Sequence, residues 1–287
     1  MTLRHLAGKK PASKKKKVSP VKGKALRLVD IPEDPDLPRG HLSVSQVEMY
    51  LRCPKQYEYR YVDGLVLPPG VALIEGGTHH DTVEFNNICK VDSGEDEDVD
   101  TVIEFFEDMF DTNSKELTKA AWKQSGDKKD NVISRGRTFL KNYMEGLAPK
   151  IKPACKPEQQ IELMLGDVPV LGYVDLQEKK QVWDYKVVKS AKSQNDANND
   201  LQLTVYSEAT GLRKVGFICF TKGNGAVKVI ESERGEGDTK AAAVLFSSVS
   251  SSIKKGAFPL CNPTNIFPCS RKWCGYWNKC RGRHIKW

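Results

Sequence analysis

The chain has 287 residues, of which 45 are Lys or Arg and 37 are Asp or Glu, so its formal net charge is +8. Hydrophobic residues make up 39%, enough for one large core, and no run of about 18 apolar residues exists, which excludes a membrane span. The basic opening MTLRHLAGKKPASKKKK has no apolar stretch after it, so it is not a secretory signal and we expect a cytoplasmic protein.

The positive charge is concentrated at the N-terminus. Residues 1–27 hold ten basic residues and no acid, so residues 28–287 carry 35 basic against 37 acidic residues, a net charge of −2. The lysine run and the prolines of residues 1–40 bury too little to fold, so we expect a disordered basic arm there and one domain over 41–287. A nucleic-acid-binding function must therefore be supported by features of the main body.

The pattern predicts four helices before residue 150. The first is capped by Ser43 or Ser45 and ends or bends at Pro54. The other three are expected to open just after Gly77, to occupy the second half of the acid-rich segment 92–111, and to span residues 130–145.

From Glu158 the hydrophobic period changes to that of strands. The apolar segments QIELMLG, VPVLGYVDL and QVWDYKVV predict an antiparallel meander. A helix ending at Gly211, the strands VGFICFTK and AVKVIESE, and a helix over about 239–255 are expected to follow. This order predicts a mixed α/β domain rather than a doubly wound one.

Two carboxylates and a lysine are expected to meet on this sheet. Asp184 and Lys186 are two residues apart on one strand and share a face, and the turn before that strand can bring Asp175 alongside Asp184. Such a group is unfavourable as plain packing but suits Mg²⁺ or Mn²⁺, which can activate water and stabilise charge on a phosphate. The lysine can orient or deprotonate the water, or offset charge in the transition state.

These residues carry a resemblance to a known family. Asp175 followed by the triplet Asp184-Tyr185-Lys186 resembles the PD-(D/E)xK nuclease superfamily and, within it, the RecB-like exonuclease branch that AddB and CRISPR adaptation nucleases share. The opening SVSQVEMYLRCPKQYEYRY also looks like the first helix of that branch, and the resemblance covers about residues 42–280. Glu162 is expected on the strand before the one that carries Asp175. Its side chain either lies close to the metal ligands without binding the metal or is an exposed charge on the strand.

A histidine and a glutamine–tyrosine pair add to the resemblance. The branch carries a histidine metal ligand on an early helix after a glycine, and EGGTHHDTVE is similar, with a glycine four residues before His80. His79 is the alternative ligand, but the four-residue steps to that glycine and to Glu84 favour His80. The branch also has a Q-x-x-x-Y motif on the helix after the lysine strand. Gln202 and Tyr206 resemble this motif and lie one helical turn apart on one face of the predicted helix.

The resemblance implies a fold and a role for each matched residue. The fold would be a restriction-endonuclease-like core of a mostly antiparallel or mixed sheet flanked by helices. Lys186 would serve the attacking water beside the catalytic carboxylates Asp175 and Asp184, and Gln202 and Tyr206 would position DNA or the lysine. The ligands of Mg²⁺ or Mn²⁺ would be His80, Asp175, Asp184 and the Tyr185 carbonyl.

Four of the eight cysteines lie within the last 27 residues, a pattern that favours metal or cluster ligation in a reducing compartment. Some RecB-like nucleases hold an iron–sulfur cluster with three C-terminal cysteines and one distant N-terminal cysteine. The C-terminal cysteines of this chain resemble those three, namely Cys269, Cys274 and Cys280. Cys53 occupies the place of the N-terminal cysteine. The resemblance implies a [4Fe–4S] cluster that staples the cysteine-rich segment 258–287 to the first helix. The cluster would be shielded by Trp273, Tyr276 and Trp277.

Other arrangements of these thiols stay open. The first C-terminal gap of four residues is wider than the frequent C-x-x-C, and Cys261 could replace Cys53 as the fourth ligand. Four local cysteines would also fit a zinc site, or the thiols could be unligated. The remaining cysteines, Cys89, Cys155 and Cys219, lie in apolar surroundings and are expected in the core.

The resemblance implies a metal-dependent DNA exonuclease that acts on single strands or ends. Its setting would be recombination, repair or replication in the cytoplasm of a bacterium or a phage-infected host. The chain has no P-loop, so unwinding would come from a separate helicase or recombination protein. The alternative is a non-catalytic or zinc-stapled DNA-binding adaptor that retains the nuclease fold.

Overall fold

The computed structural model describes residues 31–261 and 269–280, so residues 1–30 of the expected basic arm lie outside the described residues. Residues 31–40, which the composition assigned to the arm, pack against the body. Leu37 is 4% exposed within the main core, and Asp34 forms an ion pair with Lys254 at 2.5 Å. One apolar anchor and one ion pair extend the folded chain upstream of residue 40, and overall composition cannot reveal such contacts.

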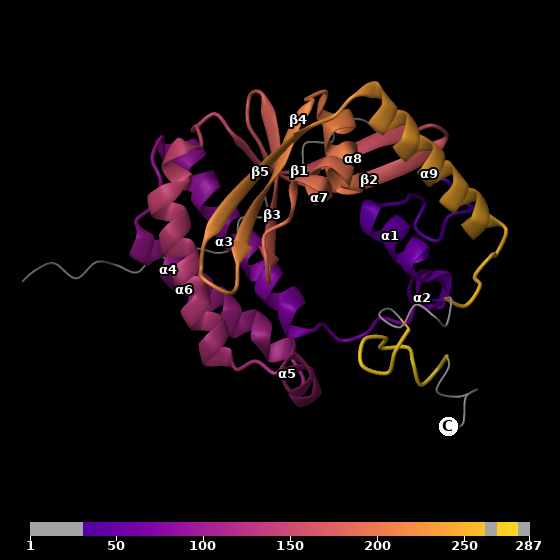
Figure 1. Ribbon diagram of the computed structural model, residues 1–287, viewed down its shortest axis with the longest axis horizontal. Helices are drawn as coiled ribbons and strands as arrows, with labels where there is room; N and C mark the ends of the chain where they lie inside the picture. The colour runs from indigo at the N-terminus through magenta and orange to yellow at the C-terminus, as the bar shows by residue number, and fades with distance from the viewer. Residues whose placement is uncertain (1–30, 262–268, 281–287) are drawn as a thin grey trace, which may run out of the picture.

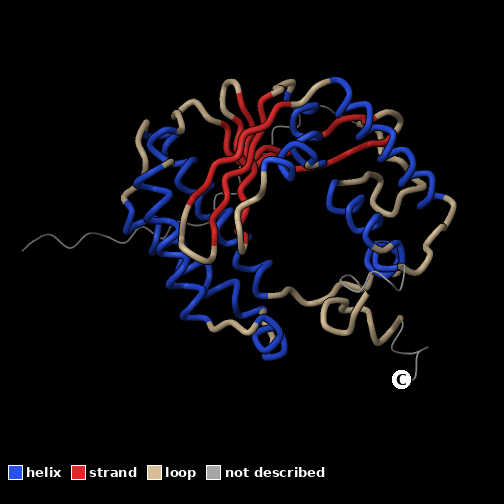
Figure 2. Tube along the Cα trace, in the orientation of Figure 1, coloured by secondary structure: helices blue, strands red, loops and turns tan. Residues whose placement is uncertain are grey.

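A five-stranded mixed sheet in the order β1-β2-β3-β4-β5 forms the centre of the molecule (Figure 2). The first three strands form the predicted antiparallel meander, β3 and β4 are parallel, and β4 and β5 are antiparallel. The expected mixed α/β class is therefore confirmed. The strands are β1 (Lys156–Leu165), β2 (Val168–Gln177), β3 (Gln181–Val188), β4 (Lys214–Thr221) and β5 (Val227–Glu233).

Helices cover both faces of the sheet (Figure 1). The α-helices before the sheet are α1 (Val44–Arg52), α2 (Pro54–Tyr57), α3 (Val71–Ser93), α4 (Val99–Asn113), α5 (Lys119–Ser125) and α6 (Lys129–Gly146). Those within and after it are α7 (Gln194–Asn199), α8 (Leu201–Thr210) and α9 (Glu236–Lys254). The shorter helices are a π-helix, η1 (Glu58–Val62), and the 3₁₀ turns η2 (Ser114–Glu116) and η3 (Ala148–Lys150).

Each face of the sheet has its own apolar core. Helices α3, α4 and α6 pack on one face around Phe106 and Phe220, whereas α1, α8 and α9 pack on the other around Phe217 and Phe246. In the described part of the chain, no helix has the length and apolar character needed to cross a bilayer.

Several predicted helix boundaries are confirmed, and one is wrong. Ser43 caps α1, which ends before Pro54, and Gly211 ends α8 in the left-handed conformation. The helix expected to open just after Gly77 instead begins at Val71, so two glycines lie inside it. Tertiary contacts outweigh the helix penalty of about 1 kcal/mol for each glycine, because Val71 and the polar residues of the first turns are buried.

Strands β2 and β3 form a fork. They pair only at Leu176 with Trp183 and at Gln177 with Val182, and then diverge. At the point of divergence the Tyr185 amide donates to Asp175 Oδ2 at 2.7 Å instead of to a backbone carbonyl of β2. The fork therefore directs an Asp175 carboxylate oxygen at the backbone of β3 beside Asp184.

Candidate active site

The two predicted carboxylates and the lysine meet at this fork. Asp184 is fully buried, and its Oδ2 lies 2.7 Å from Lys186 Nζ. Asp175 reaches the same strand through its bond to the Tyr185 amide, and its second oxygen, Oδ1, lies 3.4 Å from His80 Nδ1. Residues from α3, β2 and β3 are thus brought together as expected from sequence.

Burial sets the protonation states of this group. Burial raises the pKa of Asp184 to about 7, with Lys186 opposing the rise and Asp175 adding to it. Burial alone would lower the pKa of Lys186, but the nearby charges of Asp184 and Asp175 outweigh it and raise the pKa. Lys186 is therefore an ammonium paired with Asp184.

His79 and His80 occupy different surroundings. His80 is 34% exposed and faces Asp175, whose hydrogen bond and charge raise the pKa of the imidazole despite burial. His79 is fully buried between the rings of Phe106 and Phe220, and burial lowers its pKa to about 3. Of the two, only His80 is directed at the carboxylates.

Gln202 and Tyr206 complete a closed hydrogen-bond ring. Lys186 Nζ donates to Gln202 Oε1 at 3.2 Å, and Gln202 Nε2 donates to the Tyr206 hydroxyl at 2.6 Å. The Tyr206 hydroxyl donates to Asp184 Oδ1 at 3.4 Å, and Asp184 in turn pairs with Lys186. The ring fixes the lysine against α8.

A buried arginine holds α8 in place. All five N–H donors of Arg234 are used, with acceptors on α7, α8 and the end of β5. They include the backbone carbonyls of Ala197 and Asp200 and the Thr204 hydroxyl. No local sequence pattern marks this residue, because a lone arginine after a strand carries no signal of its own.

The Tyr185 side chain points away from this ring, toward α3 and α6. Its hydroxyl accepts from Asn87 Nδ2 at 3.2 Å and lies 3.2 Å from the Tyr143 hydroxyl. Asn87 lies on α3, two turns after His80, so this contact ties the histidine helix to the strand that carries Asp184.

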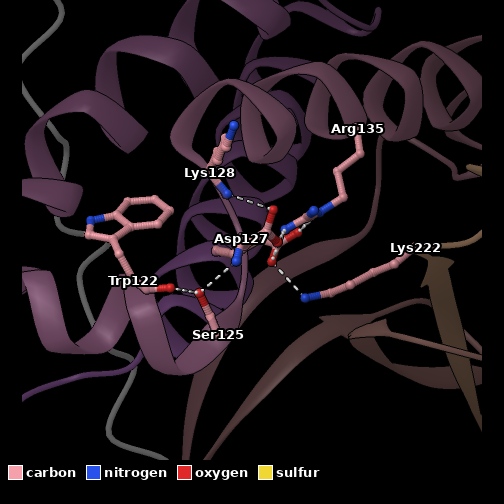
Figure 3. Close-up of polar contacts among 7 residues, drawn as sticks. Trp122, Ser125, Asp127, Lys128, Arg135 and Lys222 are labelled. Carbon is pink, nitrogen blue, oxygen red and sulfur yellow. Dashed lines mark hydrogen bonds and ion pairs between the residues drawn. The ribbon is translucent and has the colours of Figure 1, made fainter.

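An ion network that includes Asp127, Arg135 and Lys222 (Figure 3) holds the start of α3 through the buried Glu75. The Glu75 carboxylate, fully buried, accepts from Arg135 Nε and Nη2 at 2.5 and 2.9 Å and from Lys222 Nζ at 2.6 Å. Arg135 also bonds Asp127 at 2.6 Å, between α5 and α6. Because Glu75 lies five residues before His80, the clamp fixes the register of the histidine against the fork.

Comparison with known proteins identifies the family. The model of the PD-(D/E)XK nuclease superfamily matches residues 41–281. The chain belongs to this superfamily. No curated protein matches the chain.

Two solved structures resemble this PD-(D/E)XK protein. One is the crystal structure of "Putative exonuclease" from Eubacterium rectale, with 15% identity, a TM-score of 0.48, and coverage of 86% of this chain and 88% of that one. The other is the crystal structure of SSO0001, with 14% identity, a TM-score of 0.30, and coverage of 58% and 84%. Both TM-scores are below 0.5, so the family assignment rests on the sequence match.

Further acids of this PD-(D/E)XK protein gather beside His80. Glu158 lies across from Asp175 in the β1–β2 register and adopts φ = 28°, a backbone conformation that strains a non-glycine residue. Burial and the adjacent Glu158 raise the pKa of Glu84 to about 8. Glu162 accepts a hydrogen bond from Gln160 and lies about 13 Å along the strand from Glu158.

Five cysteines line one small cavity between α2 and the C-terminal segment. They are Cys53, Cys261, Cys269, Cys274 and Cys280. Burial raises the pKa of the Cys280 thiol; Tyr59 lowers it, and the nearby Cys274, Cys53 and Cys269 raise it. Cys89, expected in the core, is only partly buried, whereas Cys155 and Cys219 are buried as expected.

The C-terminal segment is fixed to the first helices. Gln56 Nε2 donates to Cys274 Sγ at 3.3 Å, and the Tyr276 hydroxyl donates to the Leu65 carbonyl at 2.6 Å. Gly275 packs beside Leu67, whose side chain would have to move to make room for a Cβ there. Tyr276 and Trp277 line or border the cavity, but Trp273 is 55% exposed and does not shield it as expected.

The donor chemistry fits two metal groups, although neither is pre-arranged. Across residues 31–261 and 269–280, no three His, Cys, Asp or Glu side chains already form a group that could hold a metal ion. At the fork the carboxylates are occupied by Lys186, His80 and a backbone amide. The carboxylate oxygens at the fork suit a hard divalent cation such as Mg²⁺ or Mn²⁺, and a thiol-lined cavity suits iron–sulfur or zinc.

Proposed function

We propose that this protein is a metal-dependent DNA exonuclease of the RecB-like type, acting on single strands or DNA ends. The observation that carries the proposal is the ring of Asp184, Lys186, Gln202 and Tyr206 at the β2–β3 fork, with Asp175 and His80 beside it. The branch assignment is supported by His80 facing the carboxylates and by the contact of the Gln–Tyr pair with the lysine.

His80, Asp175 and Asp184, with the Tyr185 carbonyl, are the proposed ligands of Mg²⁺ or Mn²⁺. When bound, such a cation lowers the pKa of water and offsets negative charge on a scissile phosphate. It would also favour ionised Asp184, whose pKa is raised to about 7 in the protein alone. Tyr206, through its hydroxyl, keeps this carboxylate oriented toward the fork.

Lys186 is the proposed catalytic cation. Its ammonium is held by Gln202, so it stays at the fork if Asp184 turns to another partner. From there it can orient a water molecule and stabilise charge that develops on the phosphate. Gln202 in turn is fixed by Tyr206, so the motif acts by positioning the lysine.

Digestion of end-labelled single- and double-stranded DNA, with and without Mg²⁺ or Mn²⁺, tests the proposal. Wild-type protein is expected to shorten the labelled strand only with the metal, and Asp184→Asn is expected to lose this activity. Lys180→Ala, in the exposed turn at the opposite end of β3, is the matched control and should cleave like wild type. Tight DNA binding without cleavage by the wild type would instead identify a non-catalytic adaptor.

We also propose that Cys53, Cys269, Cys274 and Cys280 hold a [4Fe–4S] cluster. The support is that all four thiols line one cavity although Cys53 and Cys269 are more than 200 residues apart in sequence. Joining them would staple the C-terminus to the first helices and restrict the unfolded chain. Cys261 lines the same cavity, so it is the competing fourth ligand, and zinc is the competing metal.

Metal analysis of anaerobically purified protein distinguishes these ligands. The cluster predicts a brown protein with bound iron, which is retained in Cys261→Ser and lost in Cys53→Ser. The reverse pattern would assign Cys261, and a colourless protein containing zinc would reject the cluster.

The biological setting is part of the same proposal. We assign the protein to recombination, repair or replication of a bacterium or phage, in the cytoplasm, with residues 41–287 as the nuclease domain. A separate helicase or recombination protein would supply unwound DNA.

A further inference from the structure

The charge of the chain is distributed over three regions: the basic N-terminal arm, an acidic middle and a basic C-terminal end. Residues 239–287 contain nine Lys or Arg and no acid. Residues 28–238 consequently hold 26 basic and 37 acidic residues, a net charge of −11. The C-terminal end is therefore a second basic region, set apart from the acid-rich rest of the body.

The described part of the C-terminal segment presents this charge next to an exposed aromatic ring. Arg271 and Lys272 are exposed, and Trp273 is 55% exposed. Lys272 Nζ lies 5.0 Å from the centre of the Trp273 ring. Tryptophan is highly buried on average, so an indole that is more than half exposed beside two cations is a candidate contact surface.

An open pocket lies next to these residues, where the C-terminal segment contacts α5. Its lining includes Gln124 of α5 together with Arg271, Lys272 and Trp277. Gln124 Nε2 donates to the Lys272 carbonyl at 2.6 Å, so α5 anchors the backbone that presents the cations. Trp273 is thus displayed on a segment that Tyr276 and Gln124 already fix in place.

The carboxylates of the active site give a reason for such a surface. A polyanionic strand is repelled by the charged carboxylates around the fork, including Asp175 and Glu158, and needs attraction from elsewhere on the molecule. A basic and aromatic surface on a rigid segment supplies it. Cations contact phosphates, and an exposed indole stacks with any base that is not already stacked in a duplex.

We propose that Arg271, Lys272 and Trp273, with the adjoining pocket, form a binding surface for single-stranded DNA. The two cations bind backbone phosphates and the indole stacks on an unpaired base, without sequence preference. This inference rests on the proposed nuclease function and names the form of its substrate. Duplex DNA, with its bases stacked on one another, can use only the cations.

The test is binding of a fluorescent oligothymidylate to the 287-residue protein, purified anaerobically and without added divalent cation, followed by anisotropy over a range of salt concentrations. Trp273→Ala is expected to weaken binding by about tenfold or more, and Trp273→Phe to restore most of it. The double variant Arg271→Ala/Lys272→Ala should reduce the slope of log K against log salt by about 1.4, the value for two phosphate contacts on a single strand.

The matched control removes the same charge elsewhere. Lys179→Ala/Lys180→Ala, in the exposed β2–β3 turn, should bind the oligonucleotide like wild type. Equal weakening in both double variants would reduce the effect to net charge and overturn the proposal, as would unchanged binding by Trp273→Ala. A larger loss on duplex than on single strands would assign the surface to duplex DNA instead.

The outcome is separable from that of the proposed function. Metal-dependent cleavage by the wild type together with unchanged binding by all three surface variants would reject this surface and leave the nuclease proposal intact. A wild-type protein that neither binds nor cleaves DNA would reject both. A melting temperature equal to that of wild type confirms that each variant keeps its fold.

Discussion

Replacing His79 with phenylalanine should stabilise the protein. The imidazole is fully buried among Phe106, Phe139 and Phe220, with ring centroids 4.5 to 5.8 Å away. Neither ring nitrogen has a hydrogen-bond partner among the described residues. A phenyl ring fills nearly the same space without a polar atom to satisfy.

The size of the effect follows from burial and from protonation. A buried polar atom without a partner destabilises by about 1–3 kcal/mol, and the slightly larger ring offsets part of the gain. At pH 7.5 we expect His79→Phe to raise the free energy of unfolding by about 1–2 kcal/mol, or roughly 2–8 °C in melting temperature.

The gain should grow as the pH falls. The pKa of His79 is about 3 when folded and near 6.5 when unfolded, so between these values only the unfolded chain binds the proton. Wild-type stability is therefore lost as the pH falls from 6.5, by about 2 kcal/mol at pH 5, and phenylalanine removes this loss.

Thermal or urea unfolding at pH 5 and pH 7.5, compared between wild type and His79→Phe, measures both parts. DNA cleavage by the same variant should remain, whereas His80→Ala should lose it. A destabilised His79→Phe protein, or a gain independent of pH, would refute the account of a neutral, unpartnered ring. Lost cleavage in His79→Phe with retained cleavage in His80→Ala would reverse the assignment of the ligand.

Two further predictions concern the residues around the ring. The pKa of Glu84 rises from 4.5 to about 8 on folding, so without divalent metal the stability of the protein should fall as the pH rises from 4.5 to 8. Glu84→Gln should reduce this fall and melt at a higher temperature than wild type at pH 8. Identical pH profiles of the two proteins would contradict this prediction. Arg234→Met leaves buried backbone carbonyls without hydrogen-bond donors, so it should lower the free energy of unfolding by about 3 kcal/mol and reduce turnover at saturating DNA. Arg234→Lys should recover part of both losses. Unchanged turnover in Arg234→Met would show that Arg234 does not position α8.

Much of the fold follows from local pattern. The meander, the acidic helix and the helix ending at Gly211 each have a clear period and a cap or turn. Local pattern does not predict the start of α3, because two adjacent glycines are typical of a helix boundary. The helix begins earlier because Val71 and Glu75 are buried against residues that are distant in sequence, such as Lys222. The packing of residues 31–40 likewise rests on Leu37 and on the Asp34–Lys254 pair.

The candidate site was predictable where its residues share a strand or a helical turn. Asp184 with Lys186 and Gln202 with Tyr206 have fixed spacings, so sequence places each pair on one face. The contributions of Glu158 and Arg234 depend on strand register and on helix ends that meet only in the folded chain. The two histidines are neighbours in sequence, where the four-residue steps to Gly76 and Glu84 favour His80, and the packing of α3 gives them different surroundings.

Cleavage of end-labelled single-stranded DNA by Lys186→Ala, at saturating Mn²⁺ and measured beside wild type, tests the central claim most directly. The account predicts metal-dependent shortening by the wild type and loss of at least a hundredfold in rate in the variant, with DNA binding nearly unchanged. Equal rates for the two proteins would contradict the assignment of the β2–β3 fork as the catalytic centre.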